Sequence, residues 1–142
     1  MKNRFIIDAG ALALYFAGDE RVKKYFDDIL AGKSEGYILE INLAEFFYKT
    51  AEILGLETAE VRYRMIRNSD LKQISASKEV TREAAILKLR NKNKLSLADS
   101  FLIAEAKMLK AIILTTDKTV KEIAKNQAIY FKIGEIKNVE RG

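Results

Sequence analysis

The sequence predicts an α/β fold: a three-layer α/β/α sandwich whose central sheet is mostly parallel. Short apolar segments rich in β-branched residues alternate along the chain with longer segments in which apolar residues recur every three or four positions. Such alternation is typical of parallel sheets covered by helices on both faces. The chain has 142 residues, no internal repeat and no proline-rich linker, so we expect residues 1–142 to form a single domain.

The order of the expected elements follows from this pattern. We expect strands over residues 4–8, 35–40, 71–75, 111–116 and 128–133. We expect helices over residues 9–18, 19–32, 42–55, 57–68, 77–93, 96–110 and 117–126. Asn42, Ser77 and Ser96 are the residue types that cap helix starts, and we expect them to be the N-caps of their helices.

Four carboxylates follow predicted strands or open predicted helices. Asp8 ends the strand 4–8, Asp117 follows the strand 111–116, and Glu45 and Asp99 lie in the first turns of their helices. Asp99 also shares a helix face with apolar residues, where a lone carboxylate is costly. Ligands of parallel sheets bind outside the carboxyl ends of the strands. If these acids converge there, a divalent cation would offset their repulsion.

Each of these acids also has an ordinary interpretation. The segments "NLAE" and "SLAD" both resemble capping boxes, in which the fourth residue turns back to the cap. Glu45 precedes Lys49 by four residues, the favourable order for a helical ion pair. Asp8 and Asp117 could cap the helices that follow them. Capping alone does not explain why the sequence around Asp8 and Asp99 is so apolar.

The composition narrows the possible chemistry. The chain contains no cysteine and no histidine, which excludes disulfides, thiolate nucleophiles, Ser-His-Asp relays and zinc sites built on those residues. A metal would need oxygen ligands, which suit Mg²⁺ or Mn²⁺. The net charge is +5, and basic residues cluster over 61–67 and 88–94. These clusters are either solvated surfaces or contacts for nucleic acid.

The sequence also bears on location. No apolar run approaches the ~20 residues needed to span a bilayer. Asp8 interrupts the first apolar segment, which argues against a signal peptide. We therefore expect a cytoplasmic protein that makes no membrane contact.

Four segments resemble, in order and spacing, the motifs of PIN-domain ribonucleases, and among these the VapC-type toxins of prokaryotic toxin–antitoxin pairs. They are "FIIDAGALALYF", "INLAEFFYK", "KLSLADSFLIAEAK" and "ILTTDKTV", and the resemblance runs from about residue 5 to residue 131. It implies a PIN-like α/β/α sandwich with an acidic pocket for Mg²⁺ or Mn²⁺. The implied catalytic and metal-binding residues are Asp8, Glu45, Asp99 and Asp117. Thr115 or Thr116 would support the pocket.

The implied activity is a metal-dependent endoribonuclease that hydrolyses RNA phosphodiesters and acts as a toxin. Asp8 and Asp99 would be direct metal ligands, Glu45 would hold or deprotonate the attacking water, and Asp117 would assist a second metal or support the others. The same resemblance implies a homodimer and a small cognate antitoxin. The candidate groove for RNA or the antitoxin comprises Arg62, Arg64, Arg67 and Lys92.

One departure from the family pattern keeps alternatives open. Ala9 and Gly10 stand where the family usually has Ser or Thr and then a small polar residue. The missing hydroxyl could weaken the metal site, so a non-catalytic PIN-like module that binds RNA or protein is the alternative. An unrelated phosphotransfer fold with Asp8 as nucleophile is disfavoured, because its motif needs a second aspartate where Gly10 stands.

Overall fold

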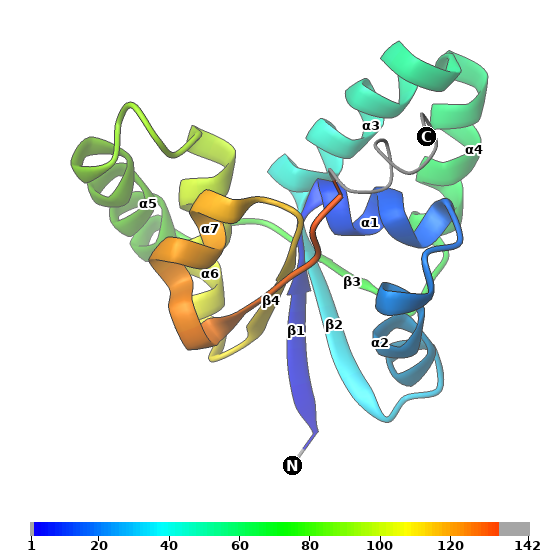
Figure 1. Cartoon of the computed structure of the whole chain (residues 1–142), viewed down its shortest axis with the longest axis horizontal. Coiled ribbons are helices and arrows are strands. Elements are labelled where there is room, and N and C mark those ends of the chain that lie inside the picture. The colour runs from blue at the N-terminus through cyan, green and yellow to red at the C-terminus, as the bar shows by residue number, and fades with distance from the viewer. Residues whose placement is uncertain (1, 134–142) are drawn as a thin grey trace, which may run out of the picture.

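A five-stranded parallel sheet forms the centre of the computed structural model, which describes residues 2–133 (Figure 1). The strand order is β3-β2-β1-β4-β5, and every neighbouring pair is parallel. The strands are β1 (Asn3–Ile7), β2 (Ser34–Leu39), β3 (Lys72–Ile74), β4 (Ile112–Thr115) and β5 (Ala128–Tyr130). The order reverses at β1, so β1 and its neighbour β4 form the switch point at which such folds bind ligands.

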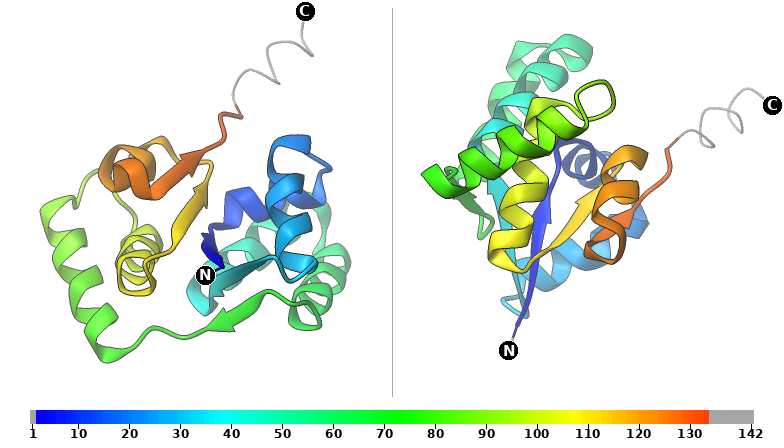
Figure 2. Two further views of the ribbon diagram at one scale, coloured as in Figure 1. Left: turned by 90° about the horizontal axis from the view of Figure 1, so that it is seen from below. Right: turned by 90° about the vertical axis from the view of Figure 1, so that its left-hand side faces the viewer.

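Seven α-helices in the described residues cover the two faces of this sheet. They are α1 (Ala9–Phe16), α2 (Glu20–Leu30), α3 (Glu40–Leu54), α4 (Leu56–Arg67), α5 (Lys78–Arg90), α6 (Leu97–Leu109) and α7 (Lys118–Ala124). The helices α1 to α4 share one apolar core with the sheet, and α6 and α7 share the other, with α5 packed on α6 (Figure 2). The predicted three-layer sandwich is therefore confirmed.

The period of two along β1 explains how one strand serves both cores. Phe5 and Ile7 point into the core beneath α1 and α2, while Ile6 between them points into the core beneath α6. All three are buried. A parallel strand with helices on both faces therefore reads as a continuous apolar run.

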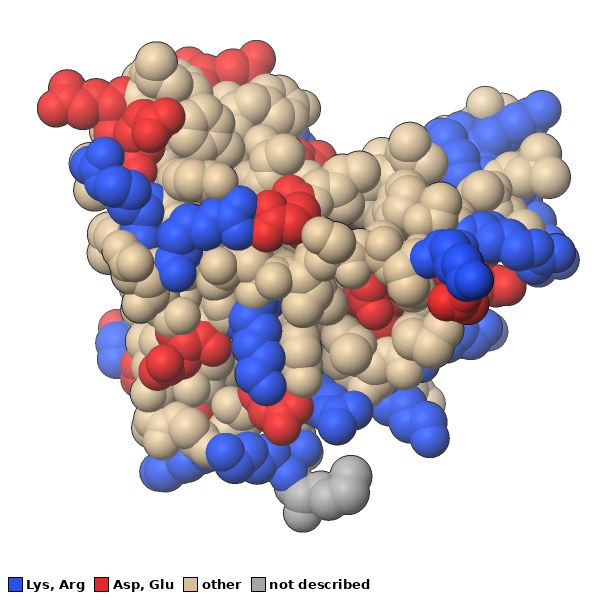
Figure 3. Space-filling view, turned by 180° about the vertical axis from the view of Figure 1, so that it is seen from behind, with Lys and Arg blue, Asp and Glu red and all other residues tan. Residues whose placement is uncertain are grey.

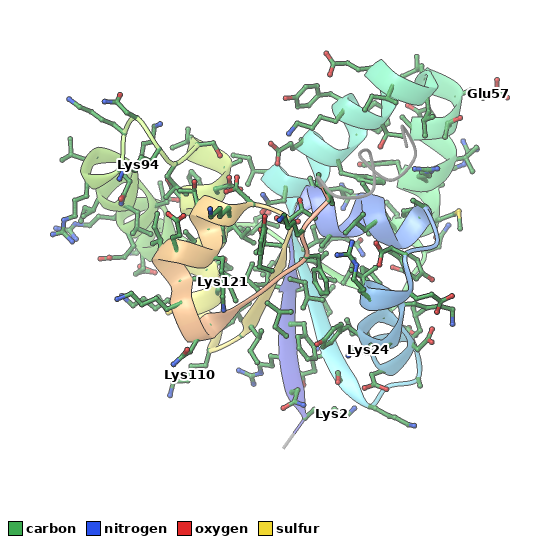
Figure 4. The ribbon with its side chains drawn as sticks, in the orientation of Figure 1. Lys2, Lys24, Glu57, Lys94, Lys110 and Lys121 are labelled. Atoms are coloured by element: carbon green, nitrogen blue, oxygen red, sulfur yellow. The ribbon has the colours of Figure 1, made fainter. Side chains whose placement is uncertain are left out.

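Two groups of helices project beyond the carboxyl end of the sheet, and we call them the two arms. The helical pair α3 and α4 projects on one side, and α5 with the loop to α6 projects on the other (Figure 1). Glu57 at the start of α4 and Lys94 on the loop before α6 lie near the outer ends of these arms (Figure 4). Among residues 2–133 no helix combines the length and the apolar character needed to cross a bilayer.

Two of the three predicted caps are confirmed and one is wrong. Ser77 and Ser96 cap α5 and α6 through their hydroxyl oxygens. Helix α3, in contrast, begins directly after β2, at Glu40, two residues before Asn42. Arg67 of α4 donates two hydrogen bonds, of 2.6 and 2.7 Å, to the Glu40 carboxylate and so holds this early start. Asn42 is instead a fully buried residue inside α3.

Candidate active site

The first acid of the site, Asp8, lies at the carboxyl end of β1 and is only 4% exposed. Its Oδ1 accepts a hydrogen bond of 2.6 Å from the amide of Ala11, which makes Asp8 the N-cap of α1. Its Oδ2 accepts hydrogen bonds from the Thr115 hydroxyl and, at 3.2 Å, from the Thr116 amide. Asp8 is thus both a helix cap and a fixed anchor between β1 and β4.

Burial dominates the titration of Asp8. Loss of hydration raises the pKa of its carboxyl, the hydrogen bonds from Thr115, Ala11 and Thr116 lower it, and the charge of Glu45 raises it again. The net result is a pKa of about 6. Among residues 2–133, no ion pair compensates Asp8 for this loss of water.

Asp99 lies in the first turn of α6, where the Ser96 hydroxyl accepts a hydrogen bond of 3.1 Å from its amide. The next turns bury Leu102, Ile103 and Ala106 in the core shared with the sheet, so the helix start is directed at the strand ends. Burial and the charge of Asp117 raise the pKa of Asp99 to about 7. Asp8 and Glu45 contribute to this shift, and the Ser96 hydrogen bond opposes it. The other three acids are therefore close enough to Asp99 for their charges to act on it.

The two remaining acids have local partners as well. Asp117 follows β4 and caps α7, its Oδ1 accepting hydrogen bonds of 2.7 Å from Thr119 and 3.2 Å from Val120. Glu45 pairs with Lys49 one turn later on α3, with 3.2 Å between Oε2 and Nζ. Asp117 is therefore a helix cap, whereas Glu45 is an ion-pair partner.

All four acids line one cavity of about 360 Å³ at the carboxyl end of the sheet. Its polar part adds Gly10, Lys49, Thr50, Arg62 and Thr116 to the acids, and its apolar part comprises Ala9, Ala13, Ala17, Phe46, Ile53 and Leu54. Seen from behind, the surface is indented between the two arms (Figure 3). The cavity size falls in the range of small-ligand sites. The structure therefore brings together the four acids that the sequence singled out.

The oxygen donors of this cavity suit a hard divalent cation that is bound mostly by water. Four carboxylates face two cationic side chains, and burial leaves Asp8 without compensation. Over residues 2–133, however, no group of three or more acidic side chains is arranged to ligate one ion together. The acids fit an ion held directly by one or two carboxylates and otherwise by water, as Mg²⁺ commonly is.

Only one of the residues predicted to form a basic groove lines the cavity. Arg62 lines it and places its guanidinium 5.0 Å from the centre of the Phe16 ring. Arg67 is held by Glu40 and Tyr63 instead. Arg64 and Lys92 are exposed and do not line the cavity. Lys92 lies in the loop that follows α5.

Two features of the cavity were not assigned a functional role from the sequence. Lys49 was interpreted only as an ion-pair partner of Glu45, although its spacing on α3 already places both on one face. Gly10 was noted only for what it lacks. A Cβ atom at Gly10 would lie 1.9 Å from the Thr116 hydroxyl oxygen, so Thr116 occupies the space that a side chain at position 10 would need.

Comparisons with known proteins agree with this fold. The toxin–antitoxin complex from Klebsiella pneumoniae superposes with a TM-score of 0.66 at 16% identity, covering 90% of this chain and 98% of that one. VapBC2 from Rickettsia felis, bound to a promoter DNA fragment, gives 0.70 at 17% identity, covering 91% and 99%. The sarcin–ricin-loop-cleaving toxin VapC20 from Mycobacterium tuberculosis gives 0.63 at 18% identity, covering 96% and 95%.

Similarity at these identities establishes the shared fold. No curated protein sequence matches the chain. The family model described as "PIN domain", in contrast, matches residues 5–126, which is most of the sequence and includes all four acids. The chain therefore belongs to the PIN domain family.

Proposed function

We propose that this protein is a divalent-metal-dependent endoribonuclease and the toxin of a toxin–antitoxin pair. The observation that carries the proposal is the gathering of Asp8, Glu45, Asp99 and Asp117 around one cavity, within a PIN domain. Solved neighbours of the same fold include an RNA-cleaving toxin and toxin–antitoxin complexes, which supports the assignment of substrate and partner.

The proposed metal is Mg²⁺ or Mn²⁺. Asp8 and Asp99 would hold it directly, and Glu45 and Asp117 would act through water, because carboxylates are the ligands that these ions prefer. When bound, such a cation supplies a more acidic water molecule and stabilises negative charge on a phosphate.

The chain's own residues perform the positioning. The hydroxyl of Thr115 and the amides of Ala11 and Thr116 fix both oxygens of Asp8, so its carboxylate needs no reorganisation during the reaction. Asp99 has a pKa of about 7 and exchanges a proton with solvent near neutral pH. Because a ligand carboxylate must be ionised, metal binding near pH 7 should release protons, which can be measured by calorimetry in buffers of different ionisation enthalpy.

The decisive experiment incubates purified protein with labelled single-stranded and stem-loop RNA. We expect cleavage with Mg²⁺ or Mn²⁺, no cleavage with EDTA, and cleavage about 10³-fold slower by Asp99→Asn. The exposed pair of Lys23 and Asp27 on α2 offers a control, since Asp27→Asn should cleave normally. RNA binding without cleavage would instead identify the non-catalytic module. Cleavage that persists in EDTA and in Asp99→Asn would refute the proposal.

The remaining assignments belong to the same proposal. We propose a single PIN-like domain over residues 1–142, a cytoplasmic location, a homodimer and a small antitoxin as the inhibitory partner. Co-expression with the product of an adjacent small open reading frame, followed by size-exclusion chromatography with light scattering, tests the last two. A monomer that binds no such product would refute both.

A further inference from the structure

Lys49 is the cation placed beside the acids of the cavity. Of the two basic residues that line it, Arg62 is stacked over Phe16, whereas Lys49 contacts Glu45 at 3.2 Å. Partial burial lowers the pKa of Lys49, but Glu45, Tyr48 and Asp99 raise it by more. Lys49 therefore stays charged within the field of the acids.

The ion pair between Lys49 and Glu45 is of a kind that the lysine can leave for another anion. The Lys49 side chain is 53% exposed and that of Glu45 is 22% exposed, so the lysine reaches the pocket from its mouth. Among residues 2–133 Glu45 is its one ion-pair partner. Exposed pairs four residues apart on a helix are weak, and an ammonium on a flexible stem can turn to another anion at little cost.

The position of Lys49 along α3 places it between the acidic end and the apolar end of the cavity. Glu45, Lys49 and Ile53 are spaced four residues apart and lie on one face of the helix, and all three line the cavity. Each step is about 6 Å along the helix axis. The lysine therefore stands between the acidic end of the cavity and its apolar end, one helical turn from each.

We propose that Lys49 is an exchangeable counterion that neutralises Glu45 in the metal-free protein and contacts an RNA phosphate when substrate enters. This inference rests on the proposed function and deepens it by naming a substrate-binding residue. Lys49 competes with a divalent cation for the field of the acids, and it offers the anionic substrate an attractive charge beside the carboxylates, which repel that substrate. The same ammonium thus weakens metal binding and strengthens RNA binding.

The test compares Lys49→Met with Lys23→Met. Lys23 forms a matched ion pair, four residues apart and 2.9 Å long, with Asp27 on α2, and lies outside the cavity lining. Both variants lose one exposed lysine and the same unit of charge. Lys49→Arg keeps the charge and serves as the rescue variant.

Two readouts avoid cleavage altogether. In EDTA, fluorescence anisotropy with a single-stranded RNA should show that Lys49→Met weakens binding about three- to tenfold and reduces the slope of log K against log salt by about 0.7. Without RNA, Mn²⁺ titrations followed by calorimetry or thermal shift should show about tenfold tighter binding, because a unit charge near the ion has been removed. Lys23→Met should match wild type in both, and Lys49→Arg should restore both.

The outcomes separate this inference from the proposed function. If Lys49→Met and Lys23→Met behave alike in both titrations while wild type cleaves RNA, Lys49 is a surface ion-pair residue and the inference is overturned. If wild type neither cleaves RNA nor responds to Mn²⁺, the proposed function itself fails. A weakened Mn²⁺ response in Lys49→Met would also overturn the inference, because it would make the lysine a structural support of the site.

Discussion

At the amino end of the sheet, Glu35 of β2 accepts hydrogen bonds from Tyr37 at 2.7 Å and from Arg4 at 3.2 Å. These hydrogen bonds, with the charges of Lys72 and Arg4, lower the pKa of Glu35. At the carboxyl end, burial raises the pKa values of Asp8 and Asp99 to about 6 and about 7. One sheet thus carries a paired carboxylate with a lowered pKa at one end and two buried carboxylates with raised pKa values at the other.

The difference between the carboxylates at the two ends of the sheet indicates which of them stabilise the fold and which are candidates for function. Local pairing at the amino end favours the ionised carboxylate in the folded chain. The arrangement at the carboxyl end favours the protonated form and leaves an attraction for a cation. Perturbed carboxylates gathered in a cavity are typical of functional sites, and the paired ones serve here as the internal reference.

The largest expected effect comes from a substitution at the carboxyl end of the sheet. If the proposed function holds, Asp99→Asn should lower RNA cleavage about 10³-fold, because the carboxylate proposed to bind the metal is lost while the shape of the side chain is kept. Glu35→Gln should leave the cleavage rate unchanged. Initial rates with Mn²⁺ measure both. Equal losses in the two variants would show that the change acts through folding and that the contrast between the ends is unrelated to catalysis.

The next effect concerns the pH dependence of the metal-free protein. The native pKa values of Asp8 and Asp99 lie above the ordinary value of 3.8, so the folded chain binds more protons than the unfolded one between about pH 4 and 7. The free energy of unfolding should therefore fall as pH rises from 5 to 7.5, by about 2–4 kcal/mol.

Urea unfolding in EDTA at several pH values measures this slope. Asp99→Asn should remove part of it, and saturating Mn²⁺ should flatten it. Glu35 acts in the opposite sense, because its pKa is lowered in the folded chain. The stability that Glu35 contributes is present at pH values above its pKa in the unfolded chain. That stability is lost as the pH falls through its pKa in the folded chain. A stability that rises between pH 5 and 7.5 would contradict the assignment of uncompensated acids.

A third prediction concerns close packing at the two ends. Gly10→Ala should destabilise the protein by about 1–3 kcal/mol, because its Cβ would meet the Thr116 hydroxyl at 1.9 Å. In a Thr116→Ala background the loss should be smaller, because only the Cβ of residue 116 remains close, at 3.1 Å, and alanine is the better helix former. Gly36→Ala, whose Cβ would meet Ile29 at 2.7 Å, should destabilise in both backgrounds. Thermal unfolding of the resulting double-mutant cycles reads out the coupling.

The smallest effect is expected at Asn42, beneath the acidic end. Neither side-chain polar atom of this buried residue has a hydrogen-bond partner among the described residues. Asn42→Leu should therefore stabilise the metal-free protein by about 1 kcal/mol, since a buried polar group without a partner is replaced by an apolar one. Chemical denaturation measures it. A loss of stability would mean that Asn42 has a partner, such as bound water.

The sequence was sufficient to place each acid at a strand end or a helix start, because those positions depend on local rules, whereas the convergence of the acids was only a condition of the metal hypothesis. A strand end and a helix start can be recognised from neighbouring residues, and parallel strands place their ends together. That is why Asp8 and Asp117, separated by most of the chain, were correctly expected at one edge. Asp99 needed only the helical spacing of the apolar residues that follow it.

The basic residues were harder to place because their positions depend on how helices pack. Arg67 pairs with Glu40 of a different helix, 27 residues away, and no local pattern identifies that contact. Asn42 was assigned as a cap by its residue type, but the chain enters α3 directly from β2, so the tertiary arrangement overrides the local preference. Arg62 lines the cavity and Arg64 does not, which depends on how α4 is rotated against the cavity.

The hydrogen bonds that fix Asp8 come from Thr115 and Thr116, which lie 107 and 108 residues later in the chain. During synthesis, the ribosome therefore makes the first acid of the pocket long before it makes the strand that anchors it. A nascent chain that lacks β4 has neither Asp117 nor a fixed Asp8. A product truncated before β4 therefore cannot assemble the acidic cavity, because it lacks both one of the four acids and the partners that fix another.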